Sequence, residues 1–199
     1  MVKLHLGCGP VYLKDGWTNI DLEMEGHYLA KDRPDLVEAN GTTVDKYYKK
    51  RVDRDAIEKK TYQKEKCVVD EYGDITDLKY TDGTVDEIML VQVFEHFTRK
   101  EGRELLNKWY KLLKPGGILH LDVPDLDRTV AGYYHSRTQR DKDWYARLLY
   151  GSQKDNFGLH HWMYSPRSLE ELLIIVGFKR VIQLPNIHFY PAFAIEAIK

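Results

Sequence analysis

The stretch that decides the fold is Leu4-His5-Leu6-Gly7-Cys8-Gly9-Pro10, followed by Trp17-Thr18-Asn19-Ile20-Asp21-Leu22-Glu23. An apolar strand runs into a Gly-x-Gly turn, and a second short strand ends on a carboxylate only a dozen residues later. Glycines in such a turn let the backbone approach a ligand closely, and an acid at the tip of the neighbouring strand can accept hydrogen bonds from a ribose diol. The stretch therefore predicts a nucleoside site at the carboxyl ends of parallel strands.

This turn differs from the dinucleotide-binding fingerprint. Tyr12 stands where the third glycine of G-x-G-x-x-G belongs, and Asp21 comes earlier than the usual spacing of roughly 20 residues. S-adenosylmethionine has a ribose and an adenine but no phosphate, so it fits the relaxed turn and early acid better than NAD does. We expect S-adenosylmethionine and its product S-adenosylhomocysteine to bind, and NADH not to bind.

Composition places the chain among ordinary globular proteins. Its 199 residues are of one-domain size, with 43% hydrophobic and 31% charged residues. The net charge of −1 argues against a nucleic-acid-coating protein, whose domain would be clearly basic. Two cysteines give no disulfide framework and no metal spacing, and no leader or membrane-length apolar run is visible. We expect a cytoplasmic protein that contacts no membrane, as a monomer or a homodimer.

Strand and helix patterns alternate along the chain. The predicted strands cover residues 3–7, 18–22, 67–71, 86–92, 117–123, 178–184 and 192–198, and the predicted helices cover about 98–114 and 166–176. The central strands are almost continuous apolar runs, as expected for strands covered on both faces. Thr98 and Glu101 form a capping-box pattern at the start of the first helix, and Pro166 occupies the first position of the second. The alternation predicts a parallel sheet covered on both sides.

Two segments lie outside the alternation, at about 24–66 and 126–164. The first is strongly charged and predicts one or two solvated helices. They form either a surface segment whose charges face water or a lid over the ligand crevice. The second is rich in Tyr and Trp and follows a strand at whose carboxyl end the ligand crevice opens. We expect both insertions of this single domain to lie over the active-site rim, with the second contacting the substrate.

Six short segments are degenerate when taken alone, but their order and spacing along the chain are informative. They are L-H-L-G-C-G-P at 4–10, N-I-D-L at 19–22, G-D-I at 73–75, V-D-E-I-M-L-V-Q-V-F-E-H-F at 85–97, L-L-K-P-G-G-I-L at 112–119 and S-L-E-E-L-L-I-I-V-G-F at 168–178. With these segments the chain resembles the class I S-adenosylmethionine-dependent methyltransferases. The short Gly-Trp-x-Asn-x-Asp link is similar to small methyltransferases of sugar and cell-surface polysaccharide pathways.

The resemblance implies a fold and a set of cofactor contacts. The fold is a Rossmann-like α/β sandwich with a seven-stranded, mostly parallel sheet in the order 3-2-1-4-5-7-6, the last strand being antiparallel. Asp21 would bind the ribose hydroxyls, and the other implied contacts are Gly7, Cys8, Gly9, Leu22, Asp74, Ile75, Val91 and Gln92. Asp21 and Asp74 would otherwise be turn or helix caps. Cys8 is interpreted as a small buried residue beside the cofactor rather than a reactive thiol.

The acceptor side is predicted from histidines. Transfer to a hydroxyl needs a base, and His96 stands just past the fourth strand, either as that base or as a structural residue that fixes the loop. His161 is the second catalytic candidate. Asp125 would bind acceptor hydroxyls or cap the next helix, and His160 and Tyr164 would line the acceptor. The paired histidines have no clearly spaced third ligand, so no metal is expected.

The leading interpretation is an S-adenosylmethionine-dependent methyltransferase for a small polar acceptor, by O-methylation of a sugar-like metabolite. The alternatives are N-methylation of an amino sugar or of a protein or nucleic-acid group, a cofactor-binding module without turnover, and a nicotinamide dehydrogenase. Nucleic acid is disfavoured because Gln92-Val93-Phe94-Glu95 replaces an Asn/Asp-Pro-Pro-Tyr-like element, and the dehydrogenase because the third glycine is missing.

Overall fold

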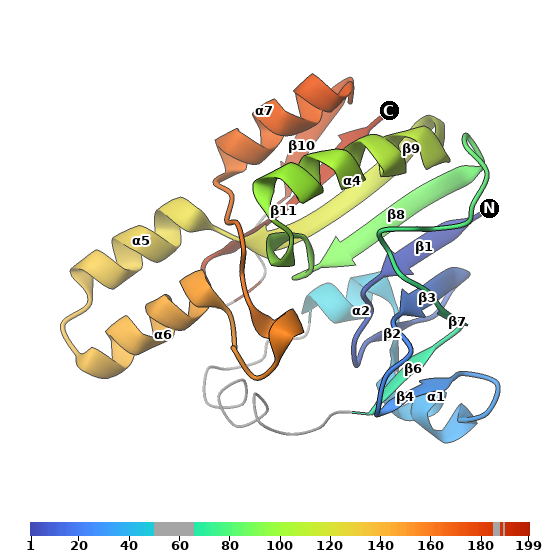
Figure 1. Cartoon of the computed structure of the whole chain (residues 1–199), viewed down its shortest axis with the longest axis horizontal. Helices are drawn as coiled ribbons and strands as arrows, with labels where there is room; N and C mark the ends of the chain where they lie inside the picture. Colours follow the sequence, from blue (N-terminus) through green and yellow to red (C-terminus); the bar gives the residue numbers. More distant parts are fainter. Residues whose placement is uncertain (50–65, 185–187, 189) are drawn as a thin grey trace.

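The computed structural model describes residues 1–49, 66–184, 188 and 190–199, so most of the charged part of the first insertion lies outside the described residues. A seven-stranded sheet with the order β10-β11-β9-β8-β1-β3-β7 forms the centre of the molecule (Figure 1). Its strands are β1 (Lys3–Leu6), β3 (Trp17–Asp21), β7 (Glu71–Tyr72), β8 (Val85–Val91), β9 (Leu113–Pro124), β10 (Arg180–Leu184) and β11 (Ala192–Ile198).

The sheet has the predicted order and directions. β1 pairs parallel with β3 and β8, β8 pairs parallel with β9, and β11 runs antiparallel to both of its neighbours. One boundary in the prediction was wrong, because the third strand is divided. β6 (Cys67–Val69) pairs with β4 (His27–Leu29) in a separate sheet, and only β7 continues the main sheet beside β3.

One face of the sheet is covered by α4 (Arg99–Leu112) and α7 (Pro166–Val176). Alternate strand residues point toward these helices, as the two-residue period of a strand requires. Both helices begin with capping boxes, at Thr98 and Ser165. The apolar core on this face includes Leu4, Leu6, Ile20, Ile88, Leu90, Leu105, Leu106, Trp109, Leu119, Leu121, Leu169 and Leu173.

The opposite face carries polar side chains. His5 Nδ1 donates to Asn19 Oδ1 at 3.0 Å, and both side chains are buried. Asn19 also bonds both backbone groups of Leu13 and the carboxylate of Asp70. Tyr12 donates to that carboxylate at 2.7 Å. These contacts tie β2 (Tyr12–Leu13) to the sheet.

The two insertions are partly helical. The first contains α1 (Pro34–Asn40), β5 (Gly41–Thr42), which pairs with β2, and α2 (Val44–Lys49). The second contains α5 (Leu126–His135), α6 (Gln139–Tyr150) and the 3-10 turn η2 (Asn156–Gly158). Figure 1 shows α5 and α6 beyond the end of the sheet toward which the arrows of β1 and β8 point. Among the described residues, no helix is long and apolar enough to cross a membrane.

Candidate cofactor and acceptor site

The glycine turn bends sharply at the tip of β1. Gly7 and Gly9 have φ values of 65° and 52°, in the left-handed region that favours glycine. A Cβ at Gly7 would come within 2.9 Å of the Val93 side chain, so that position is closed to larger residues. A Cβ at Gly9 would meet no atom of the described residues within 4 Å. The turn is therefore packed on one side and has open space on the other.

Asp21 holds this turn from the tip of β3. Its Oδ2 accepts from the backbone N–H of Gly9 at 2.8 Å, and its Oδ1 accepts from that of Leu22 at 2.8 Å. A carboxylate oxygen has two lone pairs, so each oxygen can accept a further hydrogen bond from a hydroxyl. Cys8 between the glycines is buried, and burial raises the pKa of its thiol well above the ordinary value. The thiol is therefore unreactive at neutral pH.

Asp74 and Ile75 lie in the loop after β7. Asp74 is exposed, and its Oδ1 accepts from the N–H of Thr76 at 2.8 Å, which is the turn-cap arrangement. Ile75 packs against the apolar core, and its carbonyl accepts from Trp109 Nε1 at 3.3 Å. The adenine contacts of these residues stay a prediction.

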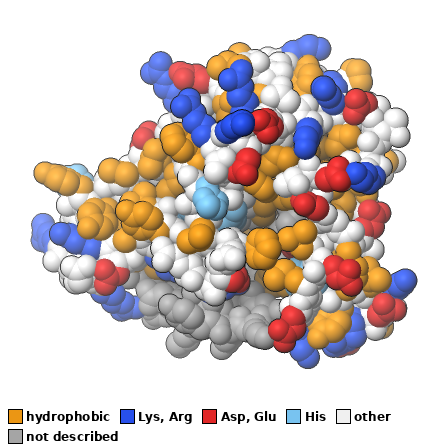
Figure 2. Space-filling model, viewed as in Figure 1, with side chains coloured by type: hydrophobic (Ala, Val, Ile, Leu, Met, Phe, Trp, Pro, Cys, Tyr) orange, Lys and Arg blue, Asp and Glu red, His pale blue; other side chains and the backbone are white. Residues whose placement is uncertain are grey.

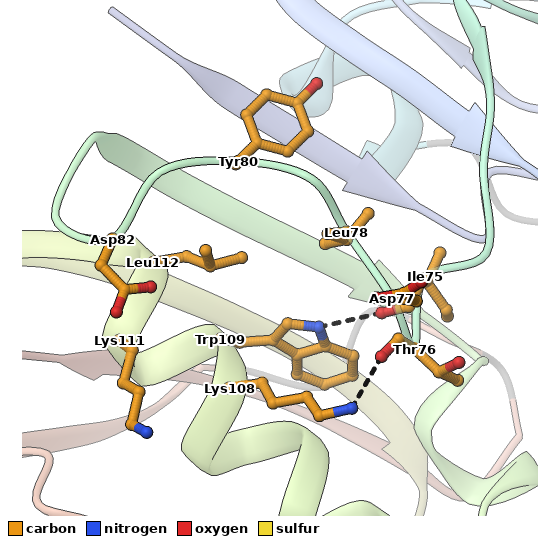
Figure 3. A pocket seen from close by; sticks show the side chains of 10 residues that line it. All are labelled: Ile75, Thr76, Asp77, Leu78, Tyr80, Asp82, Lys108, Trp109, Lys111 and Leu112. Carbon is orange, nitrogen blue, oxygen red and sulfur yellow. Dashed lines mark hydrogen bonds between the residues drawn. The ribbon is translucent and has the colours of Figure 1, made fainter.

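A shallow pocket of about 310 Å³ lies between this loop and α4 (Figure 3). Trp109 and Lys108 line it from the helix, and each donates a hydrogen bond to the loop. None of its lining residues belongs to the glycine turn or to the tip of β8. Of the residues predicted to contact the cofactor, the pocket is lined only by Ile75.

At the tip of β8 the chain turns at Gln92, whose φ is 55° although it is not a glycine. Such a conformation is uncommon and persists where the surroundings hold it. Here the backbone N–H of Gln92 donates to the carbonyl of Asp122 at 2.7 Å, and its side-chain Nε2 donates to Asp122 Oδ1 at 2.8 Å. Val91, the preceding residue, packs with Trp17 and Met89 on the polar face.

Asp122 is a functional candidate that the sequence analysis missed. It is 1% exposed, and its Oδ2 lies 2.8 Å from His188 Nε2. An acid inside the apolar run 118–123 was the available signal, because a buried carboxylate requires partners. The partner His188 stands in the segment before β11, 66 residues away in the chain, where no local pattern marks it.

Glu95, His96 and His160 form a second cluster. Glu95 belongs to the 3-10 turn η1 (Phe94–His96) and is completely buried, which raises the pKa of its carboxyl to about 8. His96 and His160 stack edge to face with ring centres 4.9 Å apart. Burial lowers the pKa of His96, and it lowers that of His160 to about 4, so both rings are neutral at pH 7.

The other predicted acceptor residues occupy different environments. His161 is exposed, whereas Tyr164 is buried in the apolar core and stacks on Phe94 with ring centres 5.2 Å apart. Asp125 is buried as the N-cap of α5, where its side chain accepts from the N–H of Arg128. Of the two roles expected for Asp125, the structure therefore displays the cap, and its contact with an acceptor stays a prediction.

The chain matches one known family model. Residues 25–121 match the model described as a methyltransferase domain. None of the curated protein sequences compared with the chain is a significant match. The family match spans the first insertion, the tip of β8 and most of β9, and begins after the glycine turn.

Solved structures share the fold at low sequence identity. A SAM-dependent methyltransferase from Archaeoglobus fulgidus is 16% identical with a TM-score of 0.50, covering 99% of this chain and 85% of its own. An O-methyltransferase family 2 protein from Planctomyces limnophilus, complexed with apigenin, is 17% identical with a TM-score of 0.56. Human N-acetylserotonin methyltransferase, complexed with SAM, is 17% identical with a TM-score of 0.53.

The last two alignments cover all of this chain. This chain spans only about half of those two proteins, 50% and 47% of their length. The match to the domain model and the seven-stranded sheet agree with the family predicted from the sequence. Residues 25–121 thus match a methyltransferase domain, and the chain shares its fold with S-adenosylmethionine-dependent methyltransferases of known structure.

Proposed function

We propose that the chain transfers a methyl group from S-adenosylmethionine to a small polar acceptor, by O-methylation of a sugar-like hydroxyl. The observation that carries the proposal is the convergence of three strand tips. Gly9 at β1 borders open space, Asp21 at β3 presents its carboxylate beside that turn, and Gln92 holds a strained backbone at β8. Tips of adjacent parallel strands are where α/β sheets bind ligands.

The cofactor fits these residues. When bound, S-adenosylmethionine supplies a methyl group that its sulfonium already activates for displacement. The space beside Gly9 accommodates the methionine portion, and the spare lone pairs of Asp21 accept the ribose hydroxyls. Asp74 and Ile75 are proposed to border the adenine, and the carbonyls of Val91 and Gln92 to lie near the sulfur. The residues that hold the cofactor would increase the rate by keeping the methyl group in line with the acceptor oxygen.

An acceptor hydroxyl must also lose its proton, and His188 is the proposed base. Asp122 contacts His188 Nε2 at 2.8 Å and stabilises the imidazolium that forms when the ring takes a proton. Asp122 also bonds Gln92, so the pair is fixed to the strand tip proposed to lie beside the sulfonium. His96 is the alternative base, because the carbonyl of Leu159 holds its proton on Nδ1 and leaves the lone pair on Nε2.

The second insertion is proposed to form the acceptor wall. Its large apolar side chains reach solvent in α5, α6 and the following turns, and Figure 2 shows apolar side chains gathered on this side of the molecule. The exposed residues are Val130, Tyr133, Tyr134, Tyr150, Phe157 and Trp162. Aromatic faces beside polar groups suit a ring-shaped metabolite, and the net charge of −1 disfavours nucleic acid.

The test is release of S-adenosylhomocysteine in the presence of pooled sugar and small hydroxylated acceptors. With an acceptor found, His188→Asn should lower turnover by roughly 10²–10⁴-fold while leaving the affinity for S-adenosylmethionine intact. Lys179→Asn, an exposed change outside the second insertion, is the control and should leave turnover unchanged. Loss of turnover in His96→Asn but not in His188→Asn would move the base to His96. Cofactor binding without turnover on any acceptor would favour a binding module.

A further inference from the structure

Two distant segments bring three metal-binding side chains together. Glu95 and His96 follow β8, whereas His160 lies in the strand-like segment before α7. The carbonyl of Glu95 accepts from the backbone N–H groups of His161 and Trp162 at 2.9 and 3.2 Å, so the two segments are fixed to each other. One donor atom from each of the three side chains lies within 4.8 Å of the others.

Glu95 is the unusual member of this group. Its side chain is completely buried, and among the residues that the structure describes neither carboxylate oxygen has a hydrogen-bond partner. The ring of His160 lies near it, with Nε2 3.9 Å from Oε1, beyond hydrogen-bond distance. A buried carboxylate without hydrogen bonds costs several kcal/mol unless a proton or a metal cation neutralises it, and a metal that binds displaces the proton. The site therefore has the acidic ligand of a cation site and, among the described residues, no cationic side chain in contact with it.

The two histidines are oriented as metal ligands are. His96 Nδ1 lies 2.8 Å from the carbonyl of Leu159, and His160 Nδ1 lies 2.9 Å from that of Leu148. A carbonyl can only accept, so each ring carries its proton on Nδ1 and its lone pair on Nε2. Metal-binding histidines characteristically donate their other ring N–H to a carbonyl or carboxylate in this way.

We propose that Glu95, His96 and His160 bind a divalent first-row transition-metal ion of the Zn²⁺ type. Two imidazoles and one carboxylate suit such ions better than Ca²⁺ or Mg²⁺, which prefer oxygen ligands. Tetrahedral bonds of about 2.0–2.2 Å put ligand atoms roughly 3.5 Å apart, so the cluster closes by about 1 Å when loaded. His160 keeps 11% of its side chain exposed and provides the route of entry.

The ion would bear on the proposed methyl transfer. Three protein ligands leave one position of a tetrahedral ion for an oxygen, as in catalytic zinc sites. The cluster begins three residues after Gln92, at the strand tip proposed to lie beside the sulfonium. Resting on that proposed function, we assign the remaining position to an acceptor oxygen, and His96 is then a ligand rather than a base.

The experiment is calorimetric titration of the EDTA-treated and dialysed full chain with Zn²⁺. We expect one ion per chain, and a rise in melting temperature because the ion binds the folded state. Glu95→Gln keeps the shape of the side chain but removes its charge, and His160→Asn removes one imidazole. Each should weaken binding by about 100-fold or more. His161→Ala, the exposed neighbour in the same segment, is the matched control and should bind as the wild type does.

Co²⁺ gives a second measurement that does not depend on activity. In the wild type, the visible absorption bands of bound Co²⁺ should be those of an ion with few ligands, all of them nitrogen or oxygen. These bands should be absent in His96→Ala. Wild-type affinity no tighter than that of His160→Asn, or equal loss in His161→Ala, would overturn the assignment. If Zn²⁺ binds as expected but S-adenosylmethionine does not, the proposed function fails while the metal site stands.

Discussion

The two faces of the central sheet are built by different kinds of interaction. The face under α4 and α7 is a continuous apolar core, in which Trp109 and Leu173 pack on the strands. The opposite face is held by buried polar pairs, such as His5 with Asn19 and Gln92 with Asp122. The larger cluster of buried apolar residues lies on the first face, whereas the opposite face has a small one around Trp17 and carries Asp122 of the proposed site. We infer that stability and chemistry are separated across the sheet.

The largest expected effect comes from the apolar face. Trp109→Ala removes a side chain that is 1% exposed and contacts Phe94, so the cavity should lower the free energy of unfolding by about 3–5 kcal/mol. Urea denaturation measures the loss. Ile175→Ala on the solvent side of α7, where the side chain is 66% exposed, is the control and should change stability by less than about 0.5 kcal/mol. Equal effects of the two changes would contradict the assignment of this face.

An intermediate loss of stability is expected when the pH is lowered, because His5 is buried on the polar face. Burial lowers the pKa of His5 to about 4 from 6.5, so between these values the unfolded chain binds a proton that the folded chain does not. Stability should therefore fall as the pH falls from 6.5 toward 4, and the contribution of His5 should be about 2 kcal/mol smaller at pH 5 than at pH 7.

The comparison that isolates this effect is the pH dependence of urea denaturation in the wild type and in His5→Gln. Between pH 7 and pH 5, the free energy of unfolding of the variant should fall by about 2 kcal/mol less than that of the wild type, whatever its value at pH 7. Parallel pH profiles for the two proteins would show that His5 titrates normally and that its burial is not maintained.

The smallest effect separates the two roles of Asp125. Asp125→Ala should destabilise the chain by about 1 kcal/mol through loss of the α5 cap, and Asp125→Ser should restore most of it because serine also caps. Thermal unfolding of the two variants measures the difference. If Asp125 also contacts the acceptor, the serine variant will be stable but will have a raised KM for acceptor.

Local patterns were sufficient to predict the apolar face. The predicted sheet order and the helices at 98–114 and 166–176 are confirmed, because strand alternation, capping boxes and helix-ending glycines are properties of adjacent residues. The third strand was placed wrongly because pairing partners, not its own sequence, divide it between two sheets.

The polar face was predictable only where a motif marks it. Gly7, Gly9 and Asp21 are found from their spacing, and the structure joins them through a hydrogen bond. The contact of Asp122 with His188 and the burial of Glu95 depend on chain segments that meet across more than 60 residues. The periodicity of a sequence carries no information about such long-range contacts, so these groups can be identified only in the folded structure.

The most direct test of the central claim is calorimetric titration of the full chain with S-adenosylmethionine, S-adenosylhomocysteine and NADH. We expect one binding site for each of the first two and no binding of NADH. The affinity should be at least about tenfold weaker in Asp21→Ala, because the ribose hydroxyls lose a charged acceptor. Tight binding of NADH without binding of either sulfur nucleoside would contradict the central claim.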